Sequence, residues 1–254
     1  MEKVKLKIVT FNVSCDTNER FAPRLELAKR HFAEEKPDII GFQEPRPGQQ
    51  QMIAEALPDY TVIGYGREKH FDGESNCVAF KTADFTLLGF HQCWLSPTPF
   101  VPGTRFEEQS SCPRVVVTLM LKHKDRDMPF RFYNTHLDHV SDLARVLGMG
   151  QILKRMEADN ADWELPMILT GDMNAEPYSE AIRAAKNAPK YPLEDMTAEL
   201  ERTFHNYGTD KGNTKIDYIF ANKGTEHGIP YCWNDTENGL YISDHYPVAC
   251  DVII

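Results

Sequence analysis

The sequence lacks several features that would place it in a simple class of proteins. No stretch of its 254 residues approaches the roughly 20 apolar residues that cross a bilayer, and residues 1–7 contain no apolar core of a secretion signal. The six cysteines include no Cys-x-x-Cys pair and no cysteine-histidine spacing that suits zinc. We therefore expect a cytoplasmic protein with free thiols that does not associate with membranes.

Positive charge is also scarce. The chain has 28 lysines and arginines against 38 aspartates and glutamates, which gives a net charge of −10. A broad basic surface for non-specific nucleic-acid binding is therefore not supported. A metal ion and a few local arginines can still bind a phosphate on an acidic protein.

Strand-like and helix-like segments alternate along the whole chain without an internal repeat or a low-complexity tail. Apolar runs predict strands over residues 6–11, 38–42, 60–65, 76–81, 86–95, 115–122, 130–134, 166–170, 215–220 and 247–254. Helical spacing predicts helices over residues 20–36, 49–57, 141–156 and 178–187. The block from 76 to 134 has strands without long helices, which indicates antiparallel pairing within it. We expect one α/β domain over residues 1–254.

Short polar clusters recur where the predicted strands end. They are Phe11-Asn12, Gln43-Glu44, Asn134 to His139, Gly171-Asp172-Met173-Asn174, Ile216-Asp217-Tyr218 and Ser243 to Pro247. Strand ends on one rim of a sheet can bring such groups together. Carboxylates, carboxamides and histidines on one rim can hold a hard cation and a phosphate, which is the requirement for phosphoester hydrolysis.

Three of these clusters offer oxygen ligands for a cation of the magnesium type. Asn12, Glu44 and Asp244 supply them from strand ends that are far apart in sequence. Each residue alone could simply cap a turn. The recurrence of the same placement favours a site for Mg²⁺, with Mn²⁺ as a substitute.

The remaining clusters offer proton-transfer groups. Asp172 can take a proton from water while Asn174 orients that water or a phosphate oxygen, although an Asx-turn after a strand explains the same residues. His245 can hydrogen-bond a phosphoryl oxygen, and Asp217 can fix its tautomer. His136 can use Glu74 in the same way. Five histidines outside these clusters are interpreted as structural: His31, His70, His91, His123 and His227.

With these residues assembled, the chain resembles the endonuclease/exonuclease/phosphatase superfamily from about Lys5 to its C-terminus, in the order of that family's motifs. The resemblance implies a four-layer α/β/β/α sandwich of two mixed β-sheets flanked by helices, the deoxyribonuclease I-like fold. It makes Glu44 the principal metal ligand, with Asn12 and Asp244 nearby. Ser14 stands where certain nucleases have Asp or Asn, which puts a second tightly held metal in doubt.

The same resemblance implies catalytic roles. Asp172 would activate or orient the attacking water, and Asn174 would bind the scissile phosphate. His245, paired with Asp217, would contact the phosphate and stabilise charge in the transition state.

It also implies further contacts to the substrate. His136 would be a second catalytic histidine, with Glu74 as its paired carboxylate, and Arg114 resembles a phosphate-contacting arginine. Bacterial members of a deadenylase-like branch share with this chain Thr135 to His139, Gly66-Arg67, Trp94-Leu95-Ser96 and Thr203-Phe204-His205. Trp94 and His205 thereby become candidates for substrate binding.

The sequence therefore predicts a magnesium-dependent phosphoesterase in which water attacks phosphorus in line, with the leaving oxygen protonated by water on the metal or by His136. The predicted substrate is a small phosphorylated metabolite, a nucleotide or a short nucleic acid, as a diester or a monoester. No obligate protein partner is inferred. The alternative is a domain of the same fold that binds a phosphorylated ligand without hydrolysing it.

Overall fold

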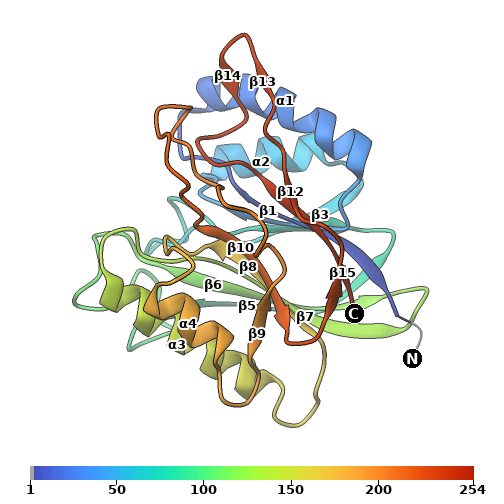
Figure 1. The fold of residues 1–254 in the computed structure, drawn as a ribbon, viewed down its shortest axis with the longest axis vertical. Coiled ribbons are helices and arrows are strands. Elements are labelled where there is room, and N and C mark those ends of the chain that lie inside the picture. The colour runs from blue at the N-terminus through green and yellow to red at the C-terminus, as the bar shows by residue number, and fades with distance from the viewer. Residues whose placement is uncertain (1–2) are drawn as a thin grey trace.

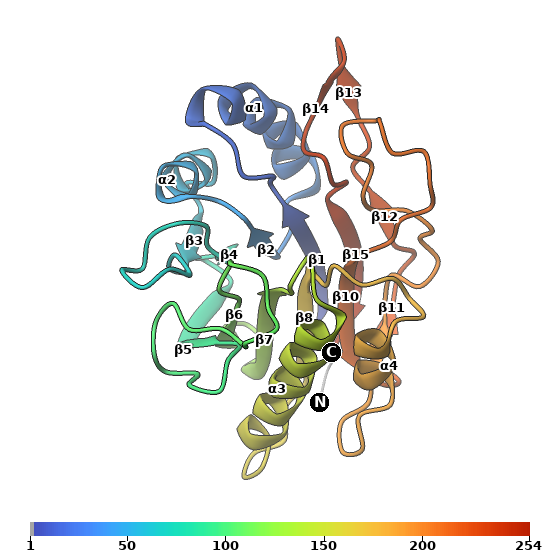
Figure 2. The ribbon, with the colours of Figure 1, turned by 90° about the vertical axis from the view of Figure 1, so that its left-hand side faces the viewer.

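Two β-sheets lie face to face at the centre of the molecule, and helices cover their outer faces (Figures 1 and 2). A computed structural model of the protein describes residues 3–254, so the first two residues of the N-terminal segment discussed above lie outside the described residues. Side chains from both sheets form a shared core between them, with Ile8 and Val78 from one sheet and Phe132 and Ile168 from the other. Burial of this apolar surface holds the two sheets together.

The first sheet has the strand order β11-β15-β1-β2-β4-β3, and β12 also pairs with β15. Its strands are β1 (Lys5–Asn12), β2 (Ile39–Gln43), β3 (Tyr60–Ile63), β4 (Val78–Lys81), β11 (Glu226–His227), β12 (Tyr231–Cys232) and β15 (Val248–Ile253). Because β1 pairs in parallel with β2 and antiparallel with β15, the sheet is mixed.

The second sheet has the order β5-β6-β7-β8-β10-β9 and is mixed because β7 and β8 are parallel. Its strands are β5 (Phe85–Trp94), β6 (Val115–His123), β7 (Met128–His136), β8 (Met167–Asp172), β9 (Leu193–Asp195) and β10 (Asp217–Asn222). A separate hairpin consists of β13 (Thr236–Glu237) and β14 (Leu240–Tyr241).

Two helices cover each sheet, which confirms the predicted four-layer α/β/β/α arrangement. Helices α1 (Asn18–Glu35) and α2 (Pro47–Ala56) lie on the first sheet, and α3 (Asp142–Asp159) and α4 (Glu180–Lys186) lie on the second (Figure 2). The hydroxyls of Thr17, Ser141 and Ser179 accept hydrogen bonds from the first turns of α1, α3 and α4. Within residues 3–254, no helix has the length and apolar character needed to span a membrane.

One expectation about the middle block is wrong. Strand β4 pairs with β2 and β3 in the first sheet, whereas β5, β6 and β7 pair antiparallel in the second. The chain passes from the first sheet to the second between Lys81 and Phe85. The short turn there contains no glycine or proline, so the sequence gives no signal of this change. The short strands β9 and β11 to β14 also escaped prediction, because two or three residues show no periodicity.

A buried polar network joins the two sheets. Gln43 Nε2 donates to Asn134 Oδ1 at 2.7 Å, and Thr170 Oγ1 donates to the same oxygen at 3.1 Å. Asn134 Nδ2 donates back to the carbonyl of Phe42 at 2.8 Å. These bonds fix the ends of β2, β7 and β8 relative to one another, just behind the clusters predicted to carry function.

Candidate active site

Strand pairing brings the predicted clusters to one edge of the two sheets. His136 is opposite Asp172 in the β7-β8 pair, and Asp172 is opposite Asp217 in the β8-β10 pair. In the first sheet, Asn12 pairs with Gln43, so Glu44 lies just beyond the end of β2. Residues from five segments of the chain therefore meet at one place.

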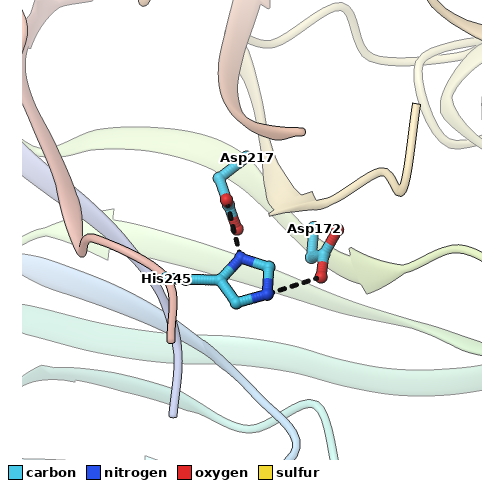
Figure 3. A group of neighbouring side chains, drawn as sticks. All are labelled: Asp172, Asp217 and His245. Carbon is cyan, nitrogen blue, oxygen red and sulfur yellow. Dashed lines mark hydrogen bonds and ion pairs between the residues drawn. The ribbon is translucent and has the colours of Figure 1, made fainter. Parts of the chain in front are cut away.

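His245 is held between two carboxylates (Figure 3). Its Nδ1 lies 2.9 Å from Asp217 Oδ2, and its Nε2 lies 3.7 Å from Asp172 Oδ2. Burial by itself would lower the pKa of His245, but Asp217 and Asp172 outweigh that effect and raise this pKa to about 10. The ring is therefore a cation at neutral pH.

This Asp172-Asp217-His245 group has the composition of a metal site, since its ligand atoms lie within 4.8 Å of one another. A protonated imidazole has no lone pair to offer a metal ion. We therefore interpret the group as a charged hydrogen-bonding unit whose Nε2–H faces the site.

Asp172 is at the centre of the cluster. Its Oδ2 accepts a hydrogen bond from Asn12 Nδ2 at 3.0 Å, and its Oδ1 accepts one from the backbone N–H of Asn174 at 2.8 Å. Burial raises the pKa of Asp172 to about 7; His245 acts against this shift and Asp217 adds to it. A carboxyl group with a pKa near neutrality can exchange a proton with water during a reaction.

Asn174 and His136 contact each other. Asn174 has a left-handed backbone with φ of 46°, and its Nδ2 donates to His136 Nε2 at 2.9 Å and to the carbonyl of Leu137 at 3.1 Å. Burial lowers the pKa of His136 well below its usual value, and Arg114 and Arg67 lower it further. His136 is therefore neutral near pH 7, and the bond from Asn174 places its proton on Nδ1.

The predicted pairing of His136 with Glu74 is wrong. His136 Nδ1 has no hydrogen-bond partner in the described part of the chain. Glu74 instead binds Arg67, whose Nη2 lies 2.6 Å from Glu74 Oε2. The backbone explains this pairing. Gly66 and Ser75 form an antiparallel bridge, so Arg67, which follows Gly66, lies opposite Glu74, which precedes Ser75.

Of the three predicted metal ligands, Asn12 and Glu44 are in contact, and Asp244 is linked to the backbone of Asn12 through Ser243. Asn12 Nδ2 is 3.0 Å from Glu44 Oε1, and Ser243 Oγ lies 2.7 Å from the carbonyl oxygen of Asn12 and 3.1 Å from Asp244 Oδ1. Glu44 has a left-handed backbone with φ of 74°, a strained conformation that is often found at functional sites. Glu44 and Asp172 each direct a carboxylate oxygen at the Asn12 amide, whose Oδ1 accepts the N–H of Ser14 at 2.9 Å. Carboxylate and amide oxygens grouped in this way fit a hard divalent cation.

The three predicted substrate-binding residues outside the central cluster differ in their placement. Arg114 precedes β6 at the same sheet edge and is close enough to Asp172 for their charges to interact. Trp94 is buried, and its Nε1 donates to the carbonyl of Arg67 at 2.6 Å. His205 is 1% exposed, stacks on Tyr246 and is packed against Tyr241. Trp94 and His205 therefore support neighbouring loops, and the geometry does not favour direct contact with a substrate.

Sequence reasoning gave no role to Arg67, His139 or Ser243. His139 Nδ1 accepts a hydrogen bond from Arg114 Nη2 at 2.9 Å, and Arg67 lies close enough to lower the pKa of Arg114. All three lie within motifs identified in the sequence, namely Gly66-Arg67, Thr135 to His139 and the cluster that begins at Ser243, but those motifs did not indicate what each side chain contacts.

Comparison with known proteins identifies the family of this site. The family profile described as "Endonuclease/Exonuclease/phosphatase family" matches residues 9–245, which include every residue of the cluster. The chain belongs to this family. A search of curated protein sequences gave no match.

Solved structures of the endonuclease/exonuclease/phosphatase family superpose on nearly the whole chain. A family member from Bacteroides thetaiotaomicron is 26% identical with a TM-score of 0.91, over 100% of this chain and 96% of that one. A mannosyl-6-phosphatase from the same organism is also 26% identical, with a TM-score of 0.88 over 98% and 100%. The catalytic domain of human Nocturnin, at 17% identity and a TM-score of 0.74 over 100% and 97%, shares the fold. The predicted family and the predicted fold class are confirmed.

Proposed function

We propose that the protein is a magnesium-dependent phosphoesterase that hydrolyses a phosphate ester by in-line attack of water. The observation that carries this proposal is the ionised His245-Asp217 pair beside Asp172, whose pKa is raised to about 7. A fixed positive charge next to a group that can accept a proton is the combination that attack of water on phosphorus requires.

We assign each residue of the cluster a separate role in the reaction. Asp172 accepts a proton from the attacking water, and Asn174 orients that water or a phosphate oxygen. His245 donates from Nε2 to a phosphoryl oxygen and counters the negative charge that develops there. Because His136 is neutral, it would act through a hydrogen bond from Nδ1 and not as a strong acid toward the leaving oxygen.

Asn12, Glu44 and Asp244 would hold the divalent cation, for which we propose Mg²⁺ with Mn²⁺ as a substitute. When bound, the cation supplies positive charge that polarises the phosphoryl group and neutralises charge in the transition state. Glu44 and Asp172 each place a carboxylate oxygen on the same Asn12 amide group, and oxygen donors gathered in this way support the assignment.

The substrate we propose is a small phosphorylated molecule or a short nucleic acid. We also propose that the protein acts in the cytoplasm as a single domain and needs no obligate protein partner. The net charge of −10 disfavours long nucleic acids. The similarity to a mannosyl-6-phosphatase, at 26% identity over full length, favours the small molecule.

The rival is a domain that binds a phosphorylated ligand without hydrolysis. Asp172→Asn separates the two, with exposed Asp162→Asn as the matched control. Each protein is assayed against nitrophenyl esters, sugar phosphates, nucleotides, RNA and DNA with Mg²⁺ or EDTA, and its ligand affinity is measured by calorimetry. We expect Mg²⁺-dependent turnover in wild type and Asp162→Asn and a loss of at least about 100-fold in Asp172→Asn. Tight binding without turnover by wild type on the whole panel would favour the binding domain.

A further inference from the structure

Arg114 is a buried cation without a hydrogen-bonded counter-ion. It is 3% exposed, and within the described part of the chain its Nη2 hydrogen-bonds only to the ring of His139. Its Nε and Nη1 have no hydrogen-bond partner among residues 3–254. An arginine that is desolvated in this way is costly unless an anion completes its environment.

The nearest carboxylate to Arg114 is already occupied. Asp138 Oδ2 is 4.0 Å from Arg114 Nε, which is too far for a hydrogen bond. That oxygen accepts hydrogen bonds from the N–H and the hydroxyl of Ser110, and Asp138 Oδ1 accepts the N–H groups of Val140 and Ser141. Asp138 therefore organises the start of α3 and leaves the donors of Arg114 free.

Arg67 adds a second guanidinium, close enough to Arg114 for the two charges to interact. It is 7% exposed, Glu74 holds its Nη2, and its Nε has no partner among the described residues. Its backbone is fixed by Trp94 Nε1 at 2.6 Å and by a hydrogen bond from its N–H to the carbonyl of Glu74 at 2.9 Å. Glu74 therefore balances the charge of Arg67, while Nε of Arg67 and Nε and Nη1 of Arg114 have no hydrogen-bond partner in residues 3–254 and are free to bind an anion.

Arg114 lies beside the reacting centre. It immediately precedes β6, and β6 pairs with β7 through Val116 and Thr135, the residue before His136. His136 in turn is opposite Asp172. Arg114 therefore lies beside the place where a phosphoryl group would meet Asp172, on the side away from Asp217. Arg67 is close enough to Arg114 and His136 for their charges to interact.

We propose that Arg67 and Arg114 form a clamp for the third non-bridging oxygen of a phosphomonoester, so that the enzyme prefers monoesters to diesters. The inference rests on the proposed function and specifies its substrate class. A phosphate diester has two non-bridging oxygens, and His245, Asn174 and the cation can bind these two in a diester or a monoester. Only a monoester has a third one, which carries a second negative charge and matches the unpaired donors of the clamp.

The test compares p-nitrophenyl phosphate with methyl p-nitrophenyl phosphate, which share a leaving group and differ in a methyl group on the third oxygen. We expect wild type to favour the monoester by about 100-fold in kcat/KM. Arg67→Met and Arg114→Met should lower kcat/KM for the monoester by about 100-fold and for the diester by less than about 10-fold. The control is Arg183→Met, an exposed arginine on α4.

Near-UV circular dichroism checks the fold of each variant. If a methionine variant is not native, Arg67→Lys and Arg114→Lys keep the charge without the planar set of donors and should give a smaller loss with the same preference for the monoester. Equal losses on both substrates, or no loss, would overturn the clamp. A wild type that hydrolyses only the diester would also overturn it while leaving the proposed function intact.

A second measurement separates the clamp from the reaction. Binding of inorganic phosphate in the presence of Mg²⁺ is measured by calorimetry on the same variants. The contribution of one charge-assisted hydrogen bond corresponds to a factor of about 10 or more in affinity. If wild type hydrolyses neither ester, the proposed function fails. The anion clamp is still supported if Arg67→Met binds phosphate at least about 10-fold more weakly and Arg183→Met does not. Equal phosphate binding by all three proteins overturns the clamp.

Discussion

The Nδ1 atom of His245 lies 2.9 Å from Asp217 Oδ2, and both side chains are buried at the junction of the two sheets. Asp217 starts β10 and His245 precedes β15, so each sheet contributes one partner. The hydrogen bond fixes the orientation of the ring and keeps its proton, which leaves Nε2–H directed toward Asp172.

Asp217→Asn should therefore change the pH dependence of activity. The Asp217 carboxylate raises the pKa of His245, so the active protonated ring persists in wild type up to about pH 10. Removing the charge lowers that pKa, so activity should be lost at a lower pH, and kcat/KM at pH 8 should fall by about 100-fold or more. A pH–rate profile checks both effects. An unchanged alkaline limb would show that His245 does not act as a cation.

Two substitutions of Glu44, to glycine and to alanine, should differ in stability but weaken Mg²⁺ binding alike. With φ at 74°, a glycine fits this position and an alanine does not. Glu44→Gly should be more stable than Glu44→Ala by about 1 kcal/mol in urea denaturation. Both variants should bind Mg²⁺ more weakly in calorimetry, because each lacks the carboxylate. Equal Mg²⁺ affinity in wild type and both variants would remove Glu44 from the metal site.

The sequence predicted most of the central cluster because its members share a recognisable position. Asn12, Glu44, Asp172, Asp217 and His245 all adjoin apolar runs, and such runs were identified correctly as strands. Their distances depend on the register of pairing between strands far apart in the chain. That register follows from packing of the whole core and cannot be read from a single strand.

The errors concern residues whose partners are set by loops and by burial. Glu74 binds Arg67 because a bridge between Gly66 and Ser75 closes the loop that contains both. His205 is covered by tyrosines from the segment that ends the chain. Neither contact has a periodic pattern in the sequence, so tertiary structure alone decides it.

A buried ion pair stabilises the segment that leads into Asp217. Lys215 Nζ lies 2.7 Å from Asp195 Oδ2 and also donates to the carbonyl of Thr197 at 2.6 Å. Lys215→Met would remove the close cation from Asp195 Oδ2, since Lys186 is 4.0 Å away, while Asp195 Oδ1 would keep its hydrogen bonds from Thr197. The substitution should lower the free energy of unfolding by about 3 kcal/mol. The double variant with Asp195→Asn should recover part of this loss. Urea denaturation of the two variants measures the difference, and a single variant as stable as wild type would refute the ion pair.

Two glycines give a matched pair of predictions. A Cβ on Gly41 would lie 2.4 Å from Thr170 Oγ1 and 2.7 Å from Asn134 Oδ1, within the network that joins the sheets, whereas a Cβ on Gly150 in α3 would meet no described atom within 4 Å. Gly41→Ala should therefore lower the free energy of unfolding by about 1–3 kcal/mol. Gly150→Ala should raise it by about 0.5–1 kcal/mol, because alanine favours the helix.

The same pair tests how the network supports the active site. Asn134 and Thr170 each lie two residues before a member of the cluster, His136 and Asp172. Displacing their side chains shifts the ends of β7 and β8, so Gly41→Ala should reduce kcat more than KM rises, whereas Gly150→Ala should leave both unchanged. Chemical denaturation and steady-state kinetics on the two variants check this. Full activity in a destabilised Gly41→Ala protein would mean that the network contributes to stability without positioning the catalytic groups.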